Sequence, residues 1–465
     1  MEELELEQLA EEINMLLEGK NIPKLKQLLT PLNPADIALI FQDIDEETRL
    51  PFIFRILPKE LAAEVFVEMD GDLQELLIRA FSDRELHEML DELYMDDTVD
   101  LIEEMPANVV TRILRNCDAE TRHTINEILK YPKDSAGALM TIEFVSLKKG
   151  MTVAEAFKRI KATGVDKETI YTCYVTDRSR KLKGVITAKD LLLAESDTVV
   201  DDIMETNVIF VDTLEDKEVV AKQFSKYDLL ALPVVDGEER LVGIITVDDA
   251  IDVMEDEASE DIAKMAAVNP LEDTYFKTSV FAHARNRFLW LFILMLSATV
   301  TGLIIQHYET AISAIPALVA FIPMLMDTGG NCGSQASAMI IRGLAIGEIK
   351  VSDYFRAVWK EVRIALFVGL ALSVVNTARV FIMYGSTIES GGAIVPTYLF
   401  AIITASALAI TILIAKFLGC SMPILASKLK IDPALMASPM ITTIVDAASV
   451  LTYFAIVTTI LSSYF

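Results

Sequence analysis

Polar residues that could bind a cation stand inside an otherwise apolar part of the sequence, at residues 323–335. This stretch reads Pro-Met-Leu-Met-Asp-Thr-Gly-Gly-Asn-Cys-Gly-Ser-Gln, so a carboxylate, Asp327, lies at membrane-like hydropathy. In a helix Asn331 and Gln335 project one turn apart, and Pro323 would weaken the helical hydrogen bonds one turn earlier. Polar groups at this depth are costly and usually face a bundle interior or a wet cavity. The alternative is a packing face built on the Gly-x-x-x-Gly pair, which does not explain the acid and the two amides.

A second carboxylate, Asp446, is the only charged residue from Ala434 to the end of the sequence. It follows Pro439 by ~10 Å along a helix that rises ~1.5 Å per residue, which is near the middle of a bilayer. Thr442 and Thr443 precede it by about one turn as candidate hydroxyl partners. A lone carboxylate at this depth indicates a functional site. The alternative is a protonated or hydrogen-bonded structural Asp.

Charge is divided unevenly along the 465 residues. Residues 1–274 hold 29 Lys and Arg against 61 Asp and Glu, a net charge of −32, whereas residues 275–465 hold 12 against 8, a net of +4, and the two sum to −28. Nucleic-acid affinity comes largely from Lys and Arg, so we do not expect the acidic part to bind nucleic acid. Its natural partners are cations, and a solvated acidic surface is the alternative.

The cysteines and histidines predict neither a disulfide framework nor a transition-metal site. The four cysteines have no paired spacing, and the four histidines are far apart. No Walker-type phosphate-binding loop is present, and we do not expect an ATPase or another enzyme. The N-terminus is rich in Glu and the first long apolar run begins near Phe288, so we expect the first part of the chain to stay in the cytoplasm.

Residues 1–130 are expected to form successive helices with an internal repeat. Helix-start signals recur every 24 residues, at Pro34, Pro58, Ser82 and Pro106. A second set follows nearly the same period, at Asp45, Asp70, Asp96 and Asp118. Repeated helix pairs stack into an α-helical solenoid, here about five pairs long at most. Asp96 and Asp100 would lie one turn apart, as in an empty cation site, and helix capping by Asp96 or Asp97 is the alternative.

Residues 135–255 read as two β-α-β-β-α units in tandem. Each begins with a short strand, at 144–147 and 208–211, and closes with a Gly-x-Ile-Thr-x-x-Asp sequence. The pair resembles a tandem CBS domain, an α/β regulatory module that often binds adenine nucleotides. The residues that this resemblance places near the ribose are Thr187 and Asp190 in the first unit and Thr246 and Asp249 in the second. A purely structural pair is the alternative.

A long acidic helix is expected next, at roughly 248–268. One of its faces carries Asp249, Asp252, Asp256 and Glu260, which are spaced by three or four residues. A helix between a regulatory module and the membrane can transmit a movement, and a divalent cation bound through several oxygens can neutralise its acidic face. A solvated linker helix is the alternative.

The remainder of the sequence predicts five membrane spans. They lie at 288–305, 311–341, 364–384, 394–419 and 435–465, and the polar stretch described above interrupts the second. Lys and Arg gather before span one, between spans two and three, and between spans four and five, whereas the opposite side has only Arg379. The positive-inside rule therefore predicts a cytoplasmic N-terminus and an extracellular or periplasmic C-terminus.

These parts in this order resemble the MgtE family of magnesium channels and transporters over essentially the whole chain. The most specific motifs are Pro323…Gly329-Gly330-Asn331-x-Gly333-x-Gln335 and Asp432-Pro433-Ala434…Pro439…Thr442-Thr443-x-x-Asp446. The fold class is then a multidomain membrane protein with an α-helical solenoid, a tandem CBS domain (α/β) and a five-helix transmembrane α bundle. The expected domains are an acidic helical N-domain at 1–131, CBS modules at 132–200 and 201–253, a connecting plug helix at 254–275 and a transmembrane domain at 276–465.

The resemblance implies Mg²⁺ uptake across the plasma membrane by a homodimer whose pore is lined by spans two and five of both protomers. Asp446 would bind Mg²⁺ in the pore, with Asn331 and Thr443 as outer contacts. The cytosolic residues expected to sense Mg²⁺ are Asp96, Asp100, Asp249, Asp252, Glu257, Glu260 and Asp261. Their acidic faces would repel one another at low internal Mg²⁺, and bridging ions would close the pore at high Mg²⁺. Thr187, Asp190 and Thr246 would contact ATP if the CBS pair binds a nucleotide.

Two other functions fit parts of the sequence: a membrane-anchored CBS nucleotide sensor, and a transporter of another divalent cation such as Mn²⁺ or Co²⁺. An anchor needs neither Asp446 nor the pair of Asn331 and Gln335. All-oxygen ligands favour Mg²⁺. Asp327 is an acid that not every relative need have, and we expect it either to attract cations at the pore mouth or to pair with a nearby residue.

Overall fold

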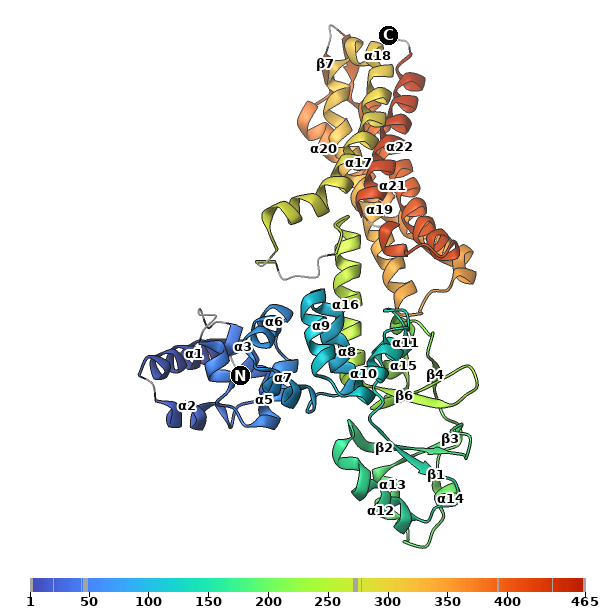
Figure 1. Ribbon diagram of the computed structural model, residues 1–465. Helices are drawn as coiled ribbons and strands as arrows, with labels where there is room; N and C mark the ends of the chain where they lie inside the picture. The colour runs from blue at the N-terminus through green and yellow to red at the C-terminus, as the bar shows by residue number, and fades with distance from the viewer. Residues whose placement is uncertain are drawn as a thin grey trace. The chain divides into compact units, whose positions relative to one another are not determined.

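A computed structural model describes residues 3–19, 21–42, 44, 49–270, 275–276, 278–390, 393–436 and 438–462 (Figure 1). The chain divides into two compact units, Met1–Glu255 and Asp256–Phe465. Each unit has hydrophobic cores of its own.

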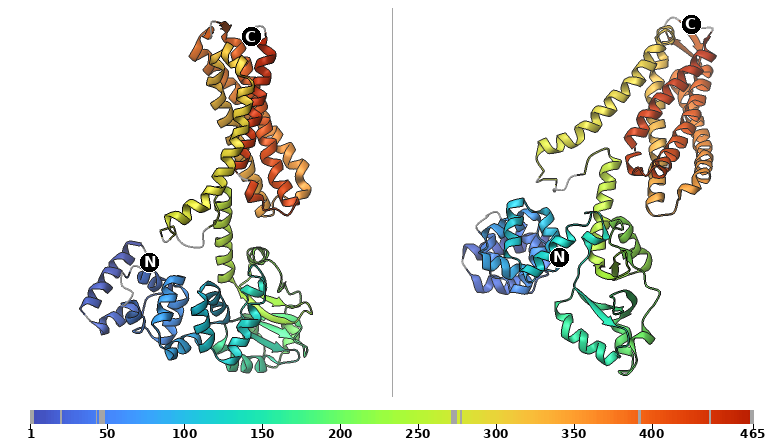
Figure 2. Two further views of the ribbon diagram at one scale, coloured as in Figure 1. Left: turned by 45° about the horizontal axis from the view of Figure 1, so that its top comes forward. Right: turned by 45° about the vertical axis from the view of Figure 1, so that its right-hand side comes forward.

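The first unit begins with a row of short helices packed side by side (Figure 2). They are α1 (Glu3–Glu18), α2 (Ile22–Leu29), α3 (Pro34–Gln42), α4 (Leu50–Phe54), α5 (Lys59–Val67), α6 (Gly71–Ala80), α7 (Asp83–Leu90), α8 (Met95–Glu104), α9 (Ala107–Asn116) and α10 (Ala119–Ile128). Helices start at or directly after most of the predicted signals, namely Pro34, Pro58, Asp70, Ser82, Pro106 and Asp118. Asp45 lies outside the described residues. The helices share one continuous core, so the predicted repeat buries its apolar faces by stacking.

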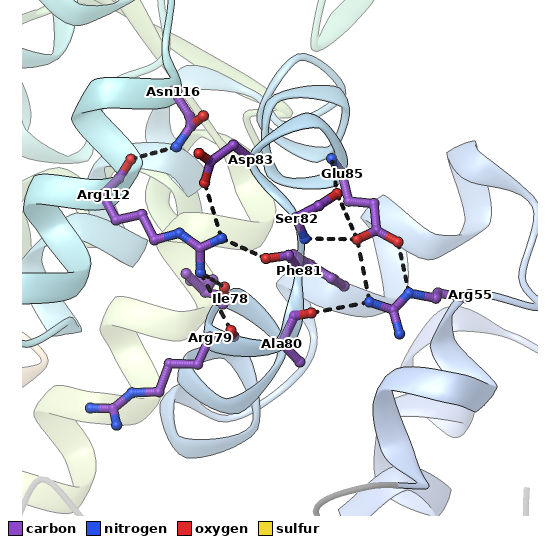
Figure 3. A network of polar contacts seen from close by, with 10 residues as sticks. All are labelled: Arg55, Ile78, Arg79, Ala80, Phe81, Ser82, Asp83, Glu85, Arg112 and Asn116. Carbon is purple, nitrogen blue, oxygen red and sulfur yellow. Dashed lines mark hydrogen bonds and ion pairs between the residues drawn. The ribbon is translucent and has the colours of Figure 1, made fainter.

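Two arginines hold the junction between α6 and α7 (Figure 3). Arg112 of α9 donates to two backbone carbonyls at the end of α6, which lack helical partners of their own. Arg55, directly after α4, donates to a third carbonyl there and lies 2.7 Å from the Glu85 carboxylate. Glu85 also completes a capping box with Ser82 at the start of α7. Neighbouring helix pairs are thus joined through charged side chains as well as through the core.

Two three-stranded sheets of the same topology follow. Their strands are β1 (Phe144–Lys148), β2 (Thr169–Thr176) and β3 (Leu182–Thr187) in the first sheet, and β4 (Val211–Asp212), β5 (Ala231–Val235) and β6 (Leu241–Thr246) in the second. The accompanying helices are α11 (Ala136–Leu139), α12 (Val153–Thr163), the 3-10 helix η1 (Gly164–Asp166), α13 (Ala188–Leu193), α14 (Val200–Ile203) and α15 (Lys217–Tyr227). In each sheet the first two strands are parallel and the last two antiparallel, as predicted for tandem β-α-β-β-α units.

The two modules contact each other through equivalent positions. The segment before β1 bridges to β6 through Thr141 and Ile244, and the segment before β4 bridges to β3 through Glu205 and Val185. This repeated pairing gives the pair a pseudo-twofold arrangement. The predicted strand at 208–211 is wrong over its first three residues, because in β4 only Val211 and the residue after it pair with β5.

The acidic helix α16 (Val247–Met265) continues directly from β6. It ends three residues before the predicted end at 268, where Ala267 adopts a left-handed conformation with a φ of 53°. The amides of Ala267 and Val268 donate to carbonyls of the last helical turn, which is a typical way to end a helix. The bounds of the five domains inferred from the sequence stay a prediction.

The second unit is a bundle of long helices. They are α17 (Val280–His307), α18 (Glu309–Ala314), η2 (Pro316–Phe321), α19 (Ile322–Ala345), η3 (Val351–Asp353), α20 (Tyr354–Tyr384), α21 (Thr397–Lys428), η4 (Pro433–Met436) and α22 (Ser438–Ile460). Four helical segments of the described chain are long and apolar enough to cross a membrane: Val280–His307, Val351–Tyr384, Thr397–Lys428 and Pro433–Ile460. The fifth long helix, α19, carries the polar stretch and packs against α21 and α22.

Two local predictions for this unit are wrong. Pro323 lies in the first turn of α19, where a helix has no backbone hydrogen bond to lose, so it does not weaken the helix. The break in the second span comes before it, through η2. The fourth span begins at Thr397 rather than at residue 394, because β7 (Thr387–Ser390) and β8 (Ala393–Pro396) form an antiparallel hairpin ahead of it.

Candidate functional site

The small and the polar residues of α19 lie on different faces. The buried glycines are Gly329, Gly330 and Gly333. The exposed polar residues follow at intervals of four and are Asp327, Asn331 and Gln335, which we call the polar stripe. Their spacing aligns them along one side of the helix.

The buried glycines allow α19 to approach its neighbours closely. A Cβ atom at Gly329 would lie 2.6 Å from Thr411 Cγ2 of α21 and 2.9 Å from Val445 Cγ1 of α22. At Gly333 it would lie 2.7 Å from Ile441 Cγ2 of α22. Packing by small residues, the alternative drawn from the sequence, therefore operates on the buried face. It leaves the polar stripe unexplained.

Asp446 lies half-buried on α22, one residue after Val445 of that glycine contact. Its carboxylate interacts electrostatically with Asp327 of α19. Thr442 and Thr443 donate their hydroxyl protons to the Pro439 carbonyl at 3.0 and 2.9 Å. Neither hydroxyl proton is therefore available to Asp446, although the lone pairs of Thr443 could still face a cation. The oxygens of these carboxylates and amides are the donors that hard divalent cations prefer.

A second acidic site lies in the first unit, around α8. Asp96 is only 7% exposed, so it does not belong to a solvated helix face. The N-cap of α8 is Tyr94, and its backbone bonds to the Asp97 carboxylate. Asp96 Oδ1 in turn accepts the backbone N–H of Asp97 at 3.0 Å, so both carboxylates bond to backbone amides at the start of α8. Asp96 is in addition a buried acid with other acids near it.

The carboxylates around α8 have raised pKa values because they are buried close to one another. Burial and the charge of Asp249 raise the pKa of Asp96 well above its ordinary value, that of Asp97 to about 6 and that of Asp100 to about 7. Burial and the neighbouring Asp248 raise the pKa of Asp249 itself to about 6. Like charges held together in this way favour a state in which protons or a cation neutralise them.

Two acids of the first CBS module complete this group. One oxygen of Glu168 is buried and has no hydrogen-bond partner within the described chain. Burial and the charge of Asp97 raise the pKa of Glu168 to about 8. Glu143 accepts a hydrogen bond from Thr141 at 2.5 Å and adds to the same field. We call the group the acidic cluster: Asp96, Asp97, Asp100, Glu143, Glu168, Asp248 and Asp249.

The sequence analysis missed four members of the acidic cluster, Asp97, Glu143, Glu168 and Asp248. Asp97 and Asp248 are direct neighbours of predicted residues, so the adjacent acids in the sequence were a usable signal. Glu143 and Glu168 come from segments next to strands, and only the folded CBS module brings them to α8.

The other predicted sensing residues continue along α16. Asp252 acts on the pKa of Asp249, whereas Glu257, Glu260 and Asp261 lie in the second unit. Glu260 pairs with Lys264, whose Nζ also lies 2.7 Å from Asp432, shortly before α22. Across the parts of the chain that the structure describes, no three His, Cys, Asp or Glu side chains are arranged to hold a metal ion.

The predicted nucleotide residues are engaged with one another. Thr187 and Asp190 form a reciprocal capping box at the start of α13. The Thr246 hydroxyl donates to Asp249 at 2.7 Å at the start of α16. Both pairs therefore stabilise helix starts, and their contact with a ribose stays a prediction.

Comparison with known families accounts for most of the chain. The MgtE family profile, described as divalent cation transporter, matches residues 322–456. The MgtE intracellular N domain matches residues 32–134, and CBS domains match residues 136–197 and 200–256.

Curated relatives match nearly end to end. The magnesium transporter MgtE of Thermus thermophilus is 35% identical over 97% of this chain and 98% of its own length. The magnesium transporter MgtE of Bacillus subtilis is 33% identical over 97% of both.

Two solved structures resemble the first unit. One is the cytosolic domain of the Mg²⁺ channel MgtE in complex with ATP, with a TM-score of 0.50 and 35% identity over 52% of this chain and 99% of that one. The other is the soluble part of a magnesium transporter, with a TM-score of 0.51 and 32% identity over 54% of this chain and 99% of that one. The predicted fold class is thereby confirmed.

Proposed function

The chain belongs to the MgtE family of magnesium transporters, and from that membership we propose that it conducts Mg²⁺ through a pore that two copies form together. It is a multi-pass membrane protein of a transporter family, not an enzyme family. The proposed pore runs along α19 and α22, with Asp446 as the carboxylate that binds the ion and Asn331 and Thr443 as outer contacts.

The polar stripe beside Asp446 is the observation that supports this proposal most strongly. Three polar residues on a membrane helix are exposed in the single chain, while the opposite glycine face is packed. Lipid cannot satisfy such groups, so they need water or a second protein surface. A second copy related by a twofold axis would supply an identical stripe and enclose a polar passage between them.

Mg²⁺ suits this chemistry because it prefers oxygen ligands and gives up its waters reluctantly. Facing Asp446 carboxylates would hold an ion that keeps several waters, and the Asn331 carboxamides would contact those waters. A complete cage of protein ligands would bind too tightly to conduct. The negative interior of a cell supplies a driving force of ~2.3 kcal/mol per charge per 100 mV.

We further propose that internal Mg²⁺ closes the pore through the acidic cluster and α16. Without a divalent cation the clustered carboxylates repel one another, and this repulsion adds to burial in raising their pKa values. Mg²⁺ bound between α8 and the start of α16 would offset this repulsion. The ion pair of Lys264 with Asp432 connects α16 to the segment before α22 and offers a mechanical link to the pore helix. Closure requires sites that bind Mg²⁺ better in the closed state.

Nucleotide binding by the CBS pair is proposed on narrower grounds. The cytosolic domain of a similar Mg²⁺ channel has been solved in complex with ATP. We propose that this chain binds ATP near Thr187, Asp190 and Thr246. We also retain the predicted orientation, with a cytoplasmic N-terminus in the plasma membrane.

Rescue of a bacterial strain that lacks Mg²⁺ uptake tests the proposed function. The parent should restore growth on low-Mg²⁺ medium, and Asp446→Ala at equal membrane abundance should not. Growth with both would remove Asp446 from the pore. Failure of the parent, together with flux of Mn²⁺ or Co²⁺ in the same cells, would assign the transport to another cation, and nucleotide binding without any flux would favour the anchored sensor.

A further inference from the structure

A basic pocket lies in the first CBS module of this strongly acidic protein. Its volume is about 170 Å³, and its cationic lining consists of Lys148, Arg159 and Arg180, which we call the basic pocket. The hydroxyls of Ser146 and Thr176 line it as well. Residues 1–274 carry a net charge of −32, so the gathering of three cations at one point is not a reflection of composition.

The three cations of the basic pocket have N–H donors that are free to bind a ligand. Lys148 Nζ donates to Thr176 Oγ1 at 2.9 Å, which uses one of its three protons. Arg159 Nε donates to the Ser146 carbonyl at 2.5 Å. In the described part of the chain none of the three cations forms an ion pair with a carboxylate. The nearby acid Asp177 is occupied by the backbone of its own turn and by Lys183.

The electrostatics of Lys148 agree with this gathering of cations. Burial, followed by the charges of Arg159 and Arg180, lowers the pKa of Lys148, and the charge of Asp177 opposes this shift in part. Three like charges with free donors are costly to hold together unless an anion joins them.

The second CBS module shows that the fold does not require these cations. It has the same strand order and the same pseudo-twofold contacts, so each residue has a counterpart. The counterparts of Lys148, Arg159 and Arg180 are Asp212, Gln223 and Glu239, and those of Ser146 and Thr176 are Phe210 and Val235. Arg180 and Glu239 even share a positive φ, of 67° and 62°. The same topology thus exists with no basic residue at these positions.

The pocket is separate from the predicted nucleotide residues. Lys148 pairs with Thr176 at one end of the first sheet, whereas Thr187 pairs with Thr172 towards the other end. A neighbouring hollow of about 450 Å³ shares Arg180 and Leu241 with the basic pocket. A ligand could therefore place an anionic group in the smaller pocket and the rest of its body in the larger one.

We propose that the basic pocket binds the phosphate group of a small phosphorylated molecule. Lys148 would contact it as a compact point charge, and the guanidinium groups of Arg159 and Arg180 would offer paired N–H donors to its oxygens. The Thr176 hydroxyl, which also contacts the Ser146 hydroxyl at 3.2 Å, holds Lys148 at the wall of the pocket. Inorganic phosphate and a phosphate ester supply the same group, so the test must separate them. The proposal does not depend on Mg²⁺ transport.

Equilibrium dialysis of the full-length protein in detergent, without divalent cations, provides the test. Radiolabelled inorganic phosphate is one probe and AMP the other. We expect saturable binding of at least one probe, weakened at least about tenfold in Lys148→Asp/Arg180→Glu, which installs the residues of the second module. Arg180→Gly is the milder variant, because glycine tolerates the positive φ at this turn, and it should weaken binding in the same direction.

Two control variants make the result specific. Lys149→Asp changes the charge next to Lys148 but on a side chain that faces Asp201, and it should leave phosphate binding unchanged. Asp190→Ala alters the predicted nucleotide end and should also leave phosphate binding unchanged. The probe whose binding falls in Lys148→Asp/Arg180→Glu but not in Asp190→Ala identifies the source of the phosphate group, because AMP held at the predicted nucleotide end would be lost in Asp190→Ala instead. Non-saturable binding of both probes, or equal loss in Lys149→Asp, would overturn the proposal.

Discussion

On α19, one set of residues packs against neighbouring helices, and another set lies on the side that we propose faces the ion. Gly329 and Gly333 occupy the face where a Cβ would collide with neighbouring helices. The polar stripe occupies the exposed side, and Asp446 interacts with its first member, Asp327. The sequence left the role of Asp327 open. In the structure its charge acts on Asp446, the carboxylate that we place in the pore.

Asp327→Asn should weaken cation attraction without abolishing conduction. Loss of one nearby charge in a wet site is worth about 1 kcal/mol, so the Mg²⁺ concentration for half-maximal flux should rise roughly fivefold. Flux into proteoliposomes across a Mg²⁺ series measures this. Glu389→Gln, an exposed acid in the β7–β8 hairpin, is the control and should behave as the parent. If the Mg²⁺ concentration for half-maximal flux is the same in Asp327→Asn as in the parent, Asp327 does not lie in the ion path.

The pore candidates could be predicted from the sequence because buried charges are energetically costly. Asp446 and Asp327 attract attention in a sequence because charges in apolar segments are expensive. The role of Thr442 and Thr443 was misjudged because spacing cannot say which oxygen a hydroxyl will choose, and both hydroxyls donate to the Pro439 carbonyl about one turn back. Glu168 could not be found at all, since its position depends on how two domains of the first unit fold together.

Helices α19, α21 and α22 depend on glycine for their close contact. Gly329→Ala should cost about 1–3 kcal/mol of stability, because a methyl group there meets side chains at 2.6 and 2.9 Å. Gly302→Ala on α17 is the matched control, since nothing lies within 4 Å of that position. Thermal unfolding of both variants in the same detergent compares them. Equal midpoints would contradict the packing described here.

The junction of α6 and α7 gives an element-scale prediction for pH. Hydrogen bonding to Arg55 and to Ser82 lowers the pKa of Glu85 to about 2, below the ordinary value of 4.5. Its stabilising contribution is therefore fully present above pH 4.5 and is lost as the pH falls through about 2. Arg55→Met should lower the free energy of unfolding at pH 6. Between pH 4.5 and 2, that free energy should then decrease less with falling pH than it does in the parent.

Denaturant unfolding at several pH values measures that difference. Arg84→Met serves as the control, because Arg84 pairs with Glu88 along an exposed face of α7. Its pH profile should follow that of the parent. Identical profiles for Arg55→Met and the parent would show that the Arg55–Glu85 contact does not hold the junction.

Helices and strands were predicted correctly where a strong local signal marks them. The predictions failed where pairing with another segment determines the structure. The 24-residue repeat begins helices where Pro and Ser signals predict them, because those residues favour helix starts wherever they occur. The strand that became β4 was predicted three residues too early and the β7–β8 hairpin was missed, because a strand is defined by its partner as much as by its own residues.

At the scale of the whole molecule, α16 links the sensor and the pore that we propose. That helix begins beside the acidic cluster and carries Lys264, which pairs with Asp432 ahead of α22. The order of parts was readable from composition and periodicity, and family comparison confirms it. The assembly of two copies was not readable from one chain and remains part of the proposal.

Asp249→Asn/Asp252→Asn should weaken closure by internal Mg²⁺. These substitutions remove the Asp249 carboxylate of the acidic cluster and the Asp252 carboxylate that acts on it, so the inhibitory Mg²⁺ concentration should rise at least about fivefold, the lower end of typical allosteric coupling. Patch recording with Mg²⁺ varied on the cytoplasmic side measures it. Asp197→Asn, an exposed acid in the loop after α13, should leave inhibition unchanged. Unaltered inhibition in the double variant would refute the sensor assignment.

The most direct test of the central claim is Mg²⁺ influx into proteoliposomes that contain the parent or Asp446→Asn, with a Mg²⁺ indicator inside and a negative internal potential. Asn keeps the size of the side chain and removes only its charge, so folding and dimer formation can be verified beside the flux. We predict rapid influx with the parent and influx near that of empty liposomes with Asp446→Asn. Equal influx through both proteins would contradict a pore in which the Asp446 carboxylate binds the ion.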